Sequence, residues 1–214
     1  MGCRALIFLA LLALPVLLLA VFFQVAAISF ERLGLTAEAG VLLFLASLTG
    51  SVVNIPVSRR RIVVREARQV FLFRFLFYYP PQVQEQIIFV NLGGAVIPTL
   101  FSLYLLTRTP LAPLVAATAI VTLAAYLLAR PMPGVGIVMP AFLPPLVAAG
   151  VALLIARGDA APVAYVSGVL GTLIGADLLH LGEVRRMGAQ AMSIGGAGVF
   201  DGIFLVGVIA VLLT

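Results

Sequence analysis

The sequence predicts an all-α fold, a polytopic membrane helix bundle of about seven transmembrane segments, one or two of them re-entrant or broken by Pro and Gly. Three observations lead to this prediction. Hydrophobic residues make up 63% of the chain and charged residues 10%, and the mean hydropathy of +1.23 lies far outside the range of soluble domains. Long apolar runs alternate with short polar breaks. All thirteen basic residues are arginines, and most lie at alternate breaks.

Seven apolar runs, each bounded by charge, Pro or Gly, approach the length of about 20 residues that a helix needs to cross a bilayer. They occupy residues 5–30, 38–57, 86–106, 111–129, 135–156, 162–182 and 192–213. We therefore expect residues 1–214 to form a single integral membrane domain. The first run is longer than the core of a signal peptide, which favours an uncleaved anchor.

The arginines predict the orientation in the cell membrane, because cytoplasmic breaks carry an excess of basic residues. With the N-terminus in the cytoplasm, ten arginines lie inside and three, Arg32, Arg108 and Arg157, lie outside. We expect a cytoplasmic N-terminus and an extracytoplasmic C-terminus. Arginines placed in this way indicate topology and do not indicate a nucleic-acid partner.

Residues 58–85 are the one sizeable segment with polar flanks. Arg61, Arg65 and Arg68 recur at helical spacing, and phenylalanines follow them. The pattern favours an amphipathic helix on the cytoplasmic surface, in contact with anionic membrane lipid. A plain positive-inside stop accounts for the arginines equally well.

Two segments depart from an ordinary spanning helix. Residues 131–145, "PMPGVGIVMPAFLPP", contain five prolines and two glycines, and each proline removes a backbone donor and blocks a helix. We expect a broken or re-entrant segment here, with a loop followed by a kinked helix as the alternative. Residues 90–106, "VNLGGAVIPTLFSLYLL", place Asn91 and a glycine pair in an apolar run. The Asn54 and Asn91 amides are expected to bond to neighbouring backbone more often than to a ligand.

Two carboxylates in apolar runs are the strongest functional signal. An ionised Asp at the bilayer centre costs about 3 kcal/mol on the lenient scale, so an intramembrane Asp faces the bundle interior, is paired or is protonated. Asp177 and Asp201 lie on consecutive runs joined by a short break. At 1.5 Å per residue they fall roughly 9 Å and 14 Å from the cytoplasmic helix ends. We expect them at similar depth, with Glu183 at the rim.

Glycines flank both carboxylates. Gly168, Gly171 and Gly175 form one stripe with Asp177 almost opposite, and His180 is expected on the Asp177 side. "SIGGAG" at residues 193–198 weakens the start of the last run. The residues expected to form close-packed or groove-lining backbone are Gly175, Gly195, Gly196, Gly198, Gly202, Pro140 and Ala141.

"VNLGGAVIPTLFSLYLL", "GTLIGADLLHLG" and "SIGGAGVFDGIFLVGVIAVLL" resemble the archaeal and bacterial integral membrane family known as domain of unknown function 1614. The resemblance covers most of residues 40–214 and implies no activity. A weaker resemblance is to the intramembrane aspartyl proteases of the G-x-G-D type. "GAGVFDGIF" looks like a stretched form of their motif around Asp201, "GAD" supplies Asp177, and "MPAFLPP" is similar to a Pro-Ala-Leu element. No G-x-G-D motif is intact, and the Pro-Ala element precedes both aspartates.

The protease resemblance implies an Asp177 and Asp201 pair that shares one proton, with one carboxylate as general base and the other as acid. The substrate would be a peptide or membrane protein. The alternative is a proton- or cation-coupled transporter or channel that uses Asp177, His180 and Asp201. In either, His180, Glu183 and Asn91 would relay protons or give polar support. A metal site and a structural scaffold remain further alternatives.

Other chemistry has no signal in the sequence. There is no P-loop, no dinucleotide fingerprint, no cysteine cluster and no G-x-S-x-G elbow. One histidine and the single Cys3 argue against a tight zinc site. We expect no cofactor and no metal, and a homo-oligomer is left open.

Overall fold

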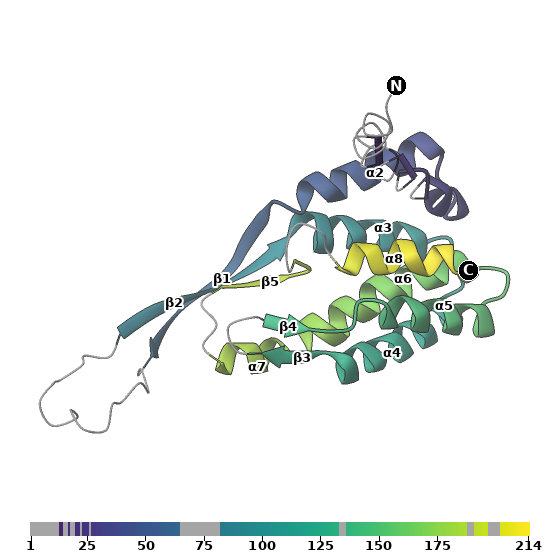
Figure 1. The fold of residues 1–214 in the computed structure, drawn as a ribbon. Coiled ribbons are helices and arrows are strands. Elements are labelled where there is room, and N and C mark those ends of the chain that lie inside the picture. The colour runs from purple at the N-terminus through teal and green to yellow at the C-terminus, as the bar shows by residue number, and fades with distance from the viewer. Residues whose placement is uncertain are drawn as a thin grey trace, which may run out of the picture.

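A computed structural model gives the fold (Figure 1). The structure describes residues 13–214 except 15–16, 18–19, 22, 26, 65–81, 133–135, 188–190 and 197–201. Short strands alternate with helices, two of which have π geometry and are labelled η. The elements are α2 (Ala37–Gly50), β1 (Asn54–Val64), β2 (Gln82–Asn91), η2 (Leu92–Val96), α3 (Ile97–Leu106), α4 (Leu111–Leu128), β3 (Arg130–Met132), β4 (Gly136–Val138), α5 (Leu143–Ile155), α6 (Ala160–Thr172), η3 (Leu173–Leu178), α7 (Leu181–Arg186), β5 (Ala191–Ile194) and α8 (Gly202–Leu212).

Helix α6 forms the centre of the bundle. It contacts α3, α4, α5 and α8, and every residue from Val163 to Val169 is buried. Gly168 faces Val206 of α8, whereas Gly171 faces Val121 of α4, so small residues let the neighbouring helices approach on two sides. The ring of Tyr165 packs edge-on against Phe101 of α3. The core is therefore built around the helix that continues into η3 and carries Asp177.

A three-stranded sheet lies at one end of the bundle. β1 and β2 form an antiparallel hairpin, with Asn54 opposite Asn91 and Arg60 opposite Gln86. β5 adds to the other side of β2 in parallel, with Ile87 opposite Ala191. The far part of the hairpin projects beyond the ends of the helices, while its base lies beside β5 (Figure 1).

The described residues contain fewer full-length spans than the sequence predicts. α4 and the continuous helix Ala160–Arg186 are each long and apolar enough to cross a membrane, and the bent pair Phe23–Arg32 and Ala37–Gly50 would make a third. The predicted runs at 111–129 and 162–182 therefore match helices of spanning length. The expectation of about seven full-length helical spans is not confirmed.

Three predicted spans begin as extended chain and become helical later. The run at 86–106 is strand to Asn91 and helix to Leu106, the run at 135–156 starts with β4, and the run at 192–213 starts with β5. Only the helical parts, 10 to 15 residues long, resemble membrane helices. A short run rich in β-branched residues such as "IIFV" suits a buried strand as well as a helix. This ambiguity explains the difference.

The predicted amphipathic helix at 58–85 is wrong for the part of that segment that the structure describes. Residues 58–64 belong to β1 and residues 82–85 belong to β2. The central stretch with Arg65, Arg68 and the phenylalanines lies outside the described residues. Arg59, Arg60 and Arg61 are consecutive in a strand, so they point alternately to the two faces of the hairpin.

The expectation of a broken segment at 131–145 is confirmed. β3 and β4 form a short antiparallel pair, in which Pro131 lies opposite Ile137. The chain then turns at residues 139–142, and α5 begins at Leu143 with prolines in its first turn. Proline fits this position because the first helical N–H groups have no partner within the helix.

Candidate functional site

Asp177 lies in the π-helical turn η3, at the point where the central helix is wider than an α-helix. π turns are rare and often occur at functional sites. Its Oδ2 atom accepts a hydrogen bond of 2.6 Å from the backbone N–H of Gly195. No described residue donates a hydrogen bond to its Oδ1 atom. Within the described part of the chain, one carboxylate oxygen is thus fixed and the other has no hydrogen-bond donor.

Gly195 ends β5 in a turn with a φ of +72°, a conformation that glycine adopts without strain. A Cβ atom added here would lie 2.5 Å from the Cβ of Ala95 in η2. Gly195 therefore has to be a glycine for both its backbone angle and its packing. The turn brings the N–H group of Gly195 to Asp177 on one side and packs on η2 on the other.

A series of hydrogen-bonded amide and hydroxyl side chains, called the polar chain below, holds the base of the sheet together. The fully buried Asn91 donates from Nδ2 to the carbonyl of Ser51 at 2.6 Å and to Asn54 Oδ1 at 3.2 Å. Asn91 Oδ1 accepts from the N–H of Gly94 at 2.8 Å. The Ser193 hydroxyl donates to Asn54 Oδ1 at 2.6 Å. Asn91 thus joins α2, β1 and η2, and Asn54 connects this junction to β5, which leads to Gly195.

Gly171 and Gly175 share a face against α4, whereas Gly168 faces α8 and α5, so the three glycines do not form the single packing stripe that the sequence predicts. His180 also lies elsewhere than expected. Gly175 packs against the backbone of Thr122 in α4, while Asp177 is bonded on the β5 side. The His180 ring stacks on Tyr126 of α4, with centroids 4.8 Å apart, so it lies with Gly175. A π turn has more residues per turn than an α-helix, so the three-residue spacing no longer puts both side chains on one face.

The His180 ring also bonds to backbone. Its Nδ1 atom lies 3.1 Å from the carbonyl oxygens of Gly175 and Ala176. Because both partners are acceptors, Nδ1 carries the proton in this arrangement. No hydrogen bond joins His180 and Asp177 in the described part of the chain, so a proton relay between them stays a prediction.

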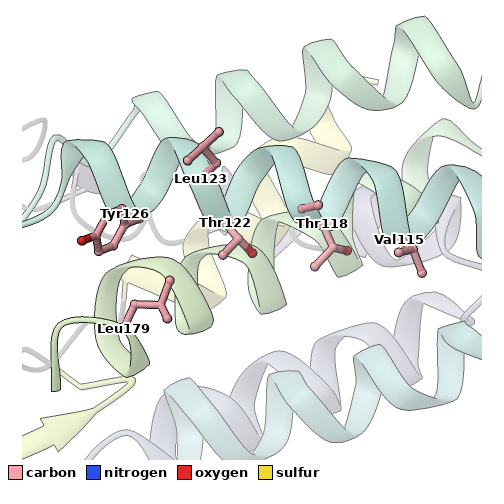
Figure 2. A pocket seen from close by; sticks show the side chains of 7 residues that line it. Val115, Thr118, Thr122, Leu123, Tyr126 and Leu179 are labelled. Carbon is pink, nitrogen blue, oxygen red and sulfur yellow. The ribbon is translucent and has the colours of Figure 1, made fainter. Parts of the chain in front are cut away.

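A groove of about 420 Å³ runs along the outer side of α4. Figure 2 shows Thr118, Thr122 and Tyr126 along one side of that helix, with Leu179 beyond them. The lining is almost entirely apolar side chain and methyl surface. Asp177 is not among the lining residues, because the groove lies on the α4 side of η3. The groove is separate from the carboxylate site.

The remaining predicted residues divide into three groups. Gly196 lies against Asn91, so a Cβ atom there would be 2.9 Å from the Asn91 Cβ. Glu183 is exposed on α7, and Pro140 and Ala141 are exposed in the turn before α5; no hydrogen bond among the described residues joins these three to Asp177. Asp201 and Gly198 lie outside the described residues, and Gly202 is the first residue of α8. Whether Asp177 and Asp201 meet stays a prediction.

Within the described residues, no group of three or more His, Cys, Asp or Glu side chains could hold a metal ion. The polar side chains at the base of the sheet are instead amides and hydroxyls. Ser193 and Ser51 were not singled out by the sequence, since serine in an apolar run commonly bonds to nearby backbone. The useful signal was Ser193 two residues before a glycine pair, which indicates a turn with a side-chain partner.

The sequence model of one protein family, described as "Protein of unknown function (DUF1614)", matches residues 48–213. The chain belongs to this family. The match begins near the end of α2 and includes the sheet, both π turns and α8, so the Asp177 site is part of the shared domain. No curated protein and no solved structure matches the chain. The resemblance to intramembrane aspartyl proteases has no support from these comparisons.

Proposed function

We propose that the protein is an intramembrane hydrolase that cleaves a peptide in extended conformation, with Asp177 as one acid-base carboxylate and Asp201 as the second. The observation that carries this proposal is the bond from Gly195 to Asp177 at the end of β5. β5 is an edge strand of the described sheet. A substrate strand laid along that edge would lead directly to the carboxylate.

The two edges of the described sheet differ in how readily they can pair with an added strand. The β1 edge contains Pro56, a bulge between Pro56 and Ser58, and three consecutive arginines. These are features by which proteins block strand addition. The β5 edge, Ala191–Ile194, has no proline and no charge. Extended peptides bind open edges through main-chain hydrogen bonds, so β5 is the edge where a peptide substrate fits.

The hydrolysis requires a water and two carboxyl groups that share one proton. The ionised carboxylate removes a proton from water while the protonated one donates to the carbonyl oxygen of the peptide. The new C–O bond gives a tetrahedral intermediate. Its collapse breaks the C–N bond. One carboxyl group donates its proton to the leaving amine, and the other carboxylate takes a proton from a hydroxyl group of the intermediate as the C=O bond re-forms, so the dyad regains its starting state with one proton. Gly195 fixes Asp177 Oδ2, leaving Oδ1 for this proton transfer.

The test is cleavage of transmembrane peptides by the purified full chain in detergent or nanodiscs, read by mass spectrometry. We expect Asp177→Asn and Asp201→Asn each to reduce cleavage at least about a thousandfold, in line with the loss of a general acid-base group. Glu38→Gln is the matched control, since it removes an exposed carboxylate in the first turn of α2 without touching the site. Cleavage retained in both aspartate variants would contradict the proposal.

A proton or cation site is the second candidate, and the polar chain at the base of the sheet favours it. Asn54, Asn91 and Ser193 place oxygen atoms along the route from β1 to β5. Backbone broken at a strand-to-helix junction is typical of ion sites in transporters. In proteoliposomes with an internal pH dye, proton or cation flux that is lost in Asp177→Asn, without any peptide cleavage by the parent, would select this function.

A further inference from the structure

The arginines of the described chain divide between the two ends of the bundle. The elements at the end that carries the sheet contain six, namely Arg59, Arg60, Arg61, Arg130, Arg185 and Arg186, and three acidic residues, Glu85, Asp177 and Glu183. The segment that leads into α2, the first turn of α2 and the connections α3–α4 and α5–α6 contain Arg32, Arg108 and Arg157 together with three acidic residues, Glu31, Glu38 and Asp159. Positive charge is therefore in excess only at the sheet end. The six arginines there are called the arginine belt below.

The belt lies at one level because direct contacts join its elements. Arg60 is opposite Gln86 in the hairpin, and Gln86 Nε2 donates to the carbonyl of Arg185 in α7 at 3.2 Å. β3, which begins at Arg130, lies beside α7.

Exposed apolar side chains come just before each part of the belt. Val52 is 76% exposed and Val57 is 57% exposed at the base of β1, before Arg59. Leu127, 69% exposed, precedes the exposed Arg130, and Leu179, 53% exposed, precedes the exposed Arg186. Three separate elements thus change from exposed hydrocarbon to exposed arginine at the same end. This is the profile of a surface that passes from lipid chains to lipid headgroups.

Few arginines of the belt form ion pairs with carboxylates among the described residues. The one ion pair among the described residues joins Arg61 Nε to Glu85 Oε1 at 3.7 Å, with the side chains 80% and 53% exposed. Such a pair contributes little and is readily exchanged. Guanidinium groups bind phosphate through two parallel hydrogen bonds. The free donors of the belt suit a ring of phosphate headgroups.

We propose that the arginine belt is a binding site for anionic phospholipid, in which the β1–β2 hairpin and the ends of α4 and α7 hold lipid phosphates at the bilayer surface. This site is independent of the Asp177 chemistry. It replaces the amphipathic surface helix as the element that contacts anionic lipid. In the hairpin, Arg59, Arg60 and Arg61 bind the lipid headgroups, and the apolar base of the hairpin lies against the acyl chains.

The experiment measures phosphatidylglycerol retained by the full chain, using native mass spectrometry after reconstitution in phosphatidylcholine with and without phosphatidylglycerol. We expect the parent to retain phosphatidylglycerol selectively. The R59A/R60A/R61A variant should bind it on the order of a hundredfold more weakly, since each arginine near an anionic surface contributes about a fivefold factor. R59K/R60K/R61K should keep most of the binding, because the charge remains.

Two controls test whether retention depends on the belt and on a lipid headgroup held in a bilayer. Arg157→Ala removes an exposed arginine at the opposite end and should leave retention unchanged, whereas Arg60→Ala should lower it about fivefold, even if the triple variant does not fold. Soluble glycerol phosphate should not compete. Equal retention in the parent and R60A, or full competition by glycerol phosphate, would overturn the assignment to lipid.

Discussion

The two π turns, η2 and η3, occupy similar places beside the β5 turn but hold their polar groups differently. At the start of η2, the capping residue Asn91 uses both ends of its amide, and the Ser47 hydroxyl donates to the carbonyl of Gly93. In η3, the Asp177 carboxylate is half-buried and has one hydrogen bond with the described residues. A polar group whose donors and acceptors are all hydrogen-bonded has a structural role. A carboxylate with one oxygen that accepts no hydrogen bond can take part in proton transfer.

The largest expected effect on stability is at Gly93. A Cβ atom there would collide with the backbone of Ser47 and Ser51 in α2, and backbone cannot move aside as a side chain can. We expect Gly93→Ala to destabilise the protein by about 3 kcal/mol, read as a lower unfolding temperature in detergent. Gly150→Ala is the control, because nothing lies within 4 Å of that position in α5. An unchanged unfolding temperature in Gly93→Ala would mean that η2 is not held tightly.

Removing the amide of Asn91 is expected to cost somewhat less. Asn91→Ala removes the acceptor of the Gly94 N–H and one donor to the carbonyl of Ser51. Buried groups left unpaired cost about 1–3 kcal/mol each, and partial relaxation should keep the total near 2 kcal/mol. The measurement is the same thermal unfolding. Asn91→Asp places a carboxylate oxygen against two acceptors, the Ser51 carbonyl and Asn54 Oδ1, so it should destabilise the protein at least as much as Asn91→Ala.

Changes at Asp177 should separate stability from activity. Asp177→Asn keeps an oxygen that can accept from Gly195, so we expect a change in stability below about 0.5 kcal/mol together with loss of cleavage or ion flux. Asp177→Ala removes the acceptor and should cost about 1 kcal/mol. If Asp177→Asn unfolds the protein as Asn91→Ala does, the carboxylate is a structural group and the contrast between the two turns fails.

The smallest effect is expected at Ser193, the outer member of the polar chain. Its hydroxyl bonds to Asn54 near the surface, where water can replace the lost partner. Ser193→Ala should change stability by about 0.5 kcal/mol. It should nevertheless loosen the end of β5, seen as faster amide hydrogen exchange at Gly195 and Gly196. Unchanged exchange at both glycines would show that Ser193 does not hold the turn.

The sequence predicted the features that depend on local pattern. The run at 111–129 became α4, and the Pro-rich stretch at 131–145 is broken, because apolar length and missing backbone donors act within a few residues. Asp177 could be singled out because a charge in an apolar run is costly wherever its neighbours lie. These inferences need no knowledge of which segments touch.

The features that the sequence did not predict depend on distant partners. "IIFVN" pairs with residues 54–59 on one side and with residues 191–194 on the other, and only this pairing makes it a strand. The π geometry of η3 moves His180 to Tyr126, and no propensity signals such a turn. The bond from Gly195 to Asp177 joins two segments across a break whose middle, 188–190, lies outside the described residues. Long-range contacts decided each of these cases.

The parallel pairing of β2 with β5 also constrains the order of synthesis and membrane insertion. β2 is made before α3, α4, α5 and α6, yet its second partner leaves the ribosome only after all of them. Until then one side of β2 has unpaired N–H and C=O groups, which hydrocarbon does not tolerate. The hairpin base therefore has to wait in water or against another polypeptide. Chains truncated before Ala191 should be the ones that membrane quality-control proteases recognise and remove.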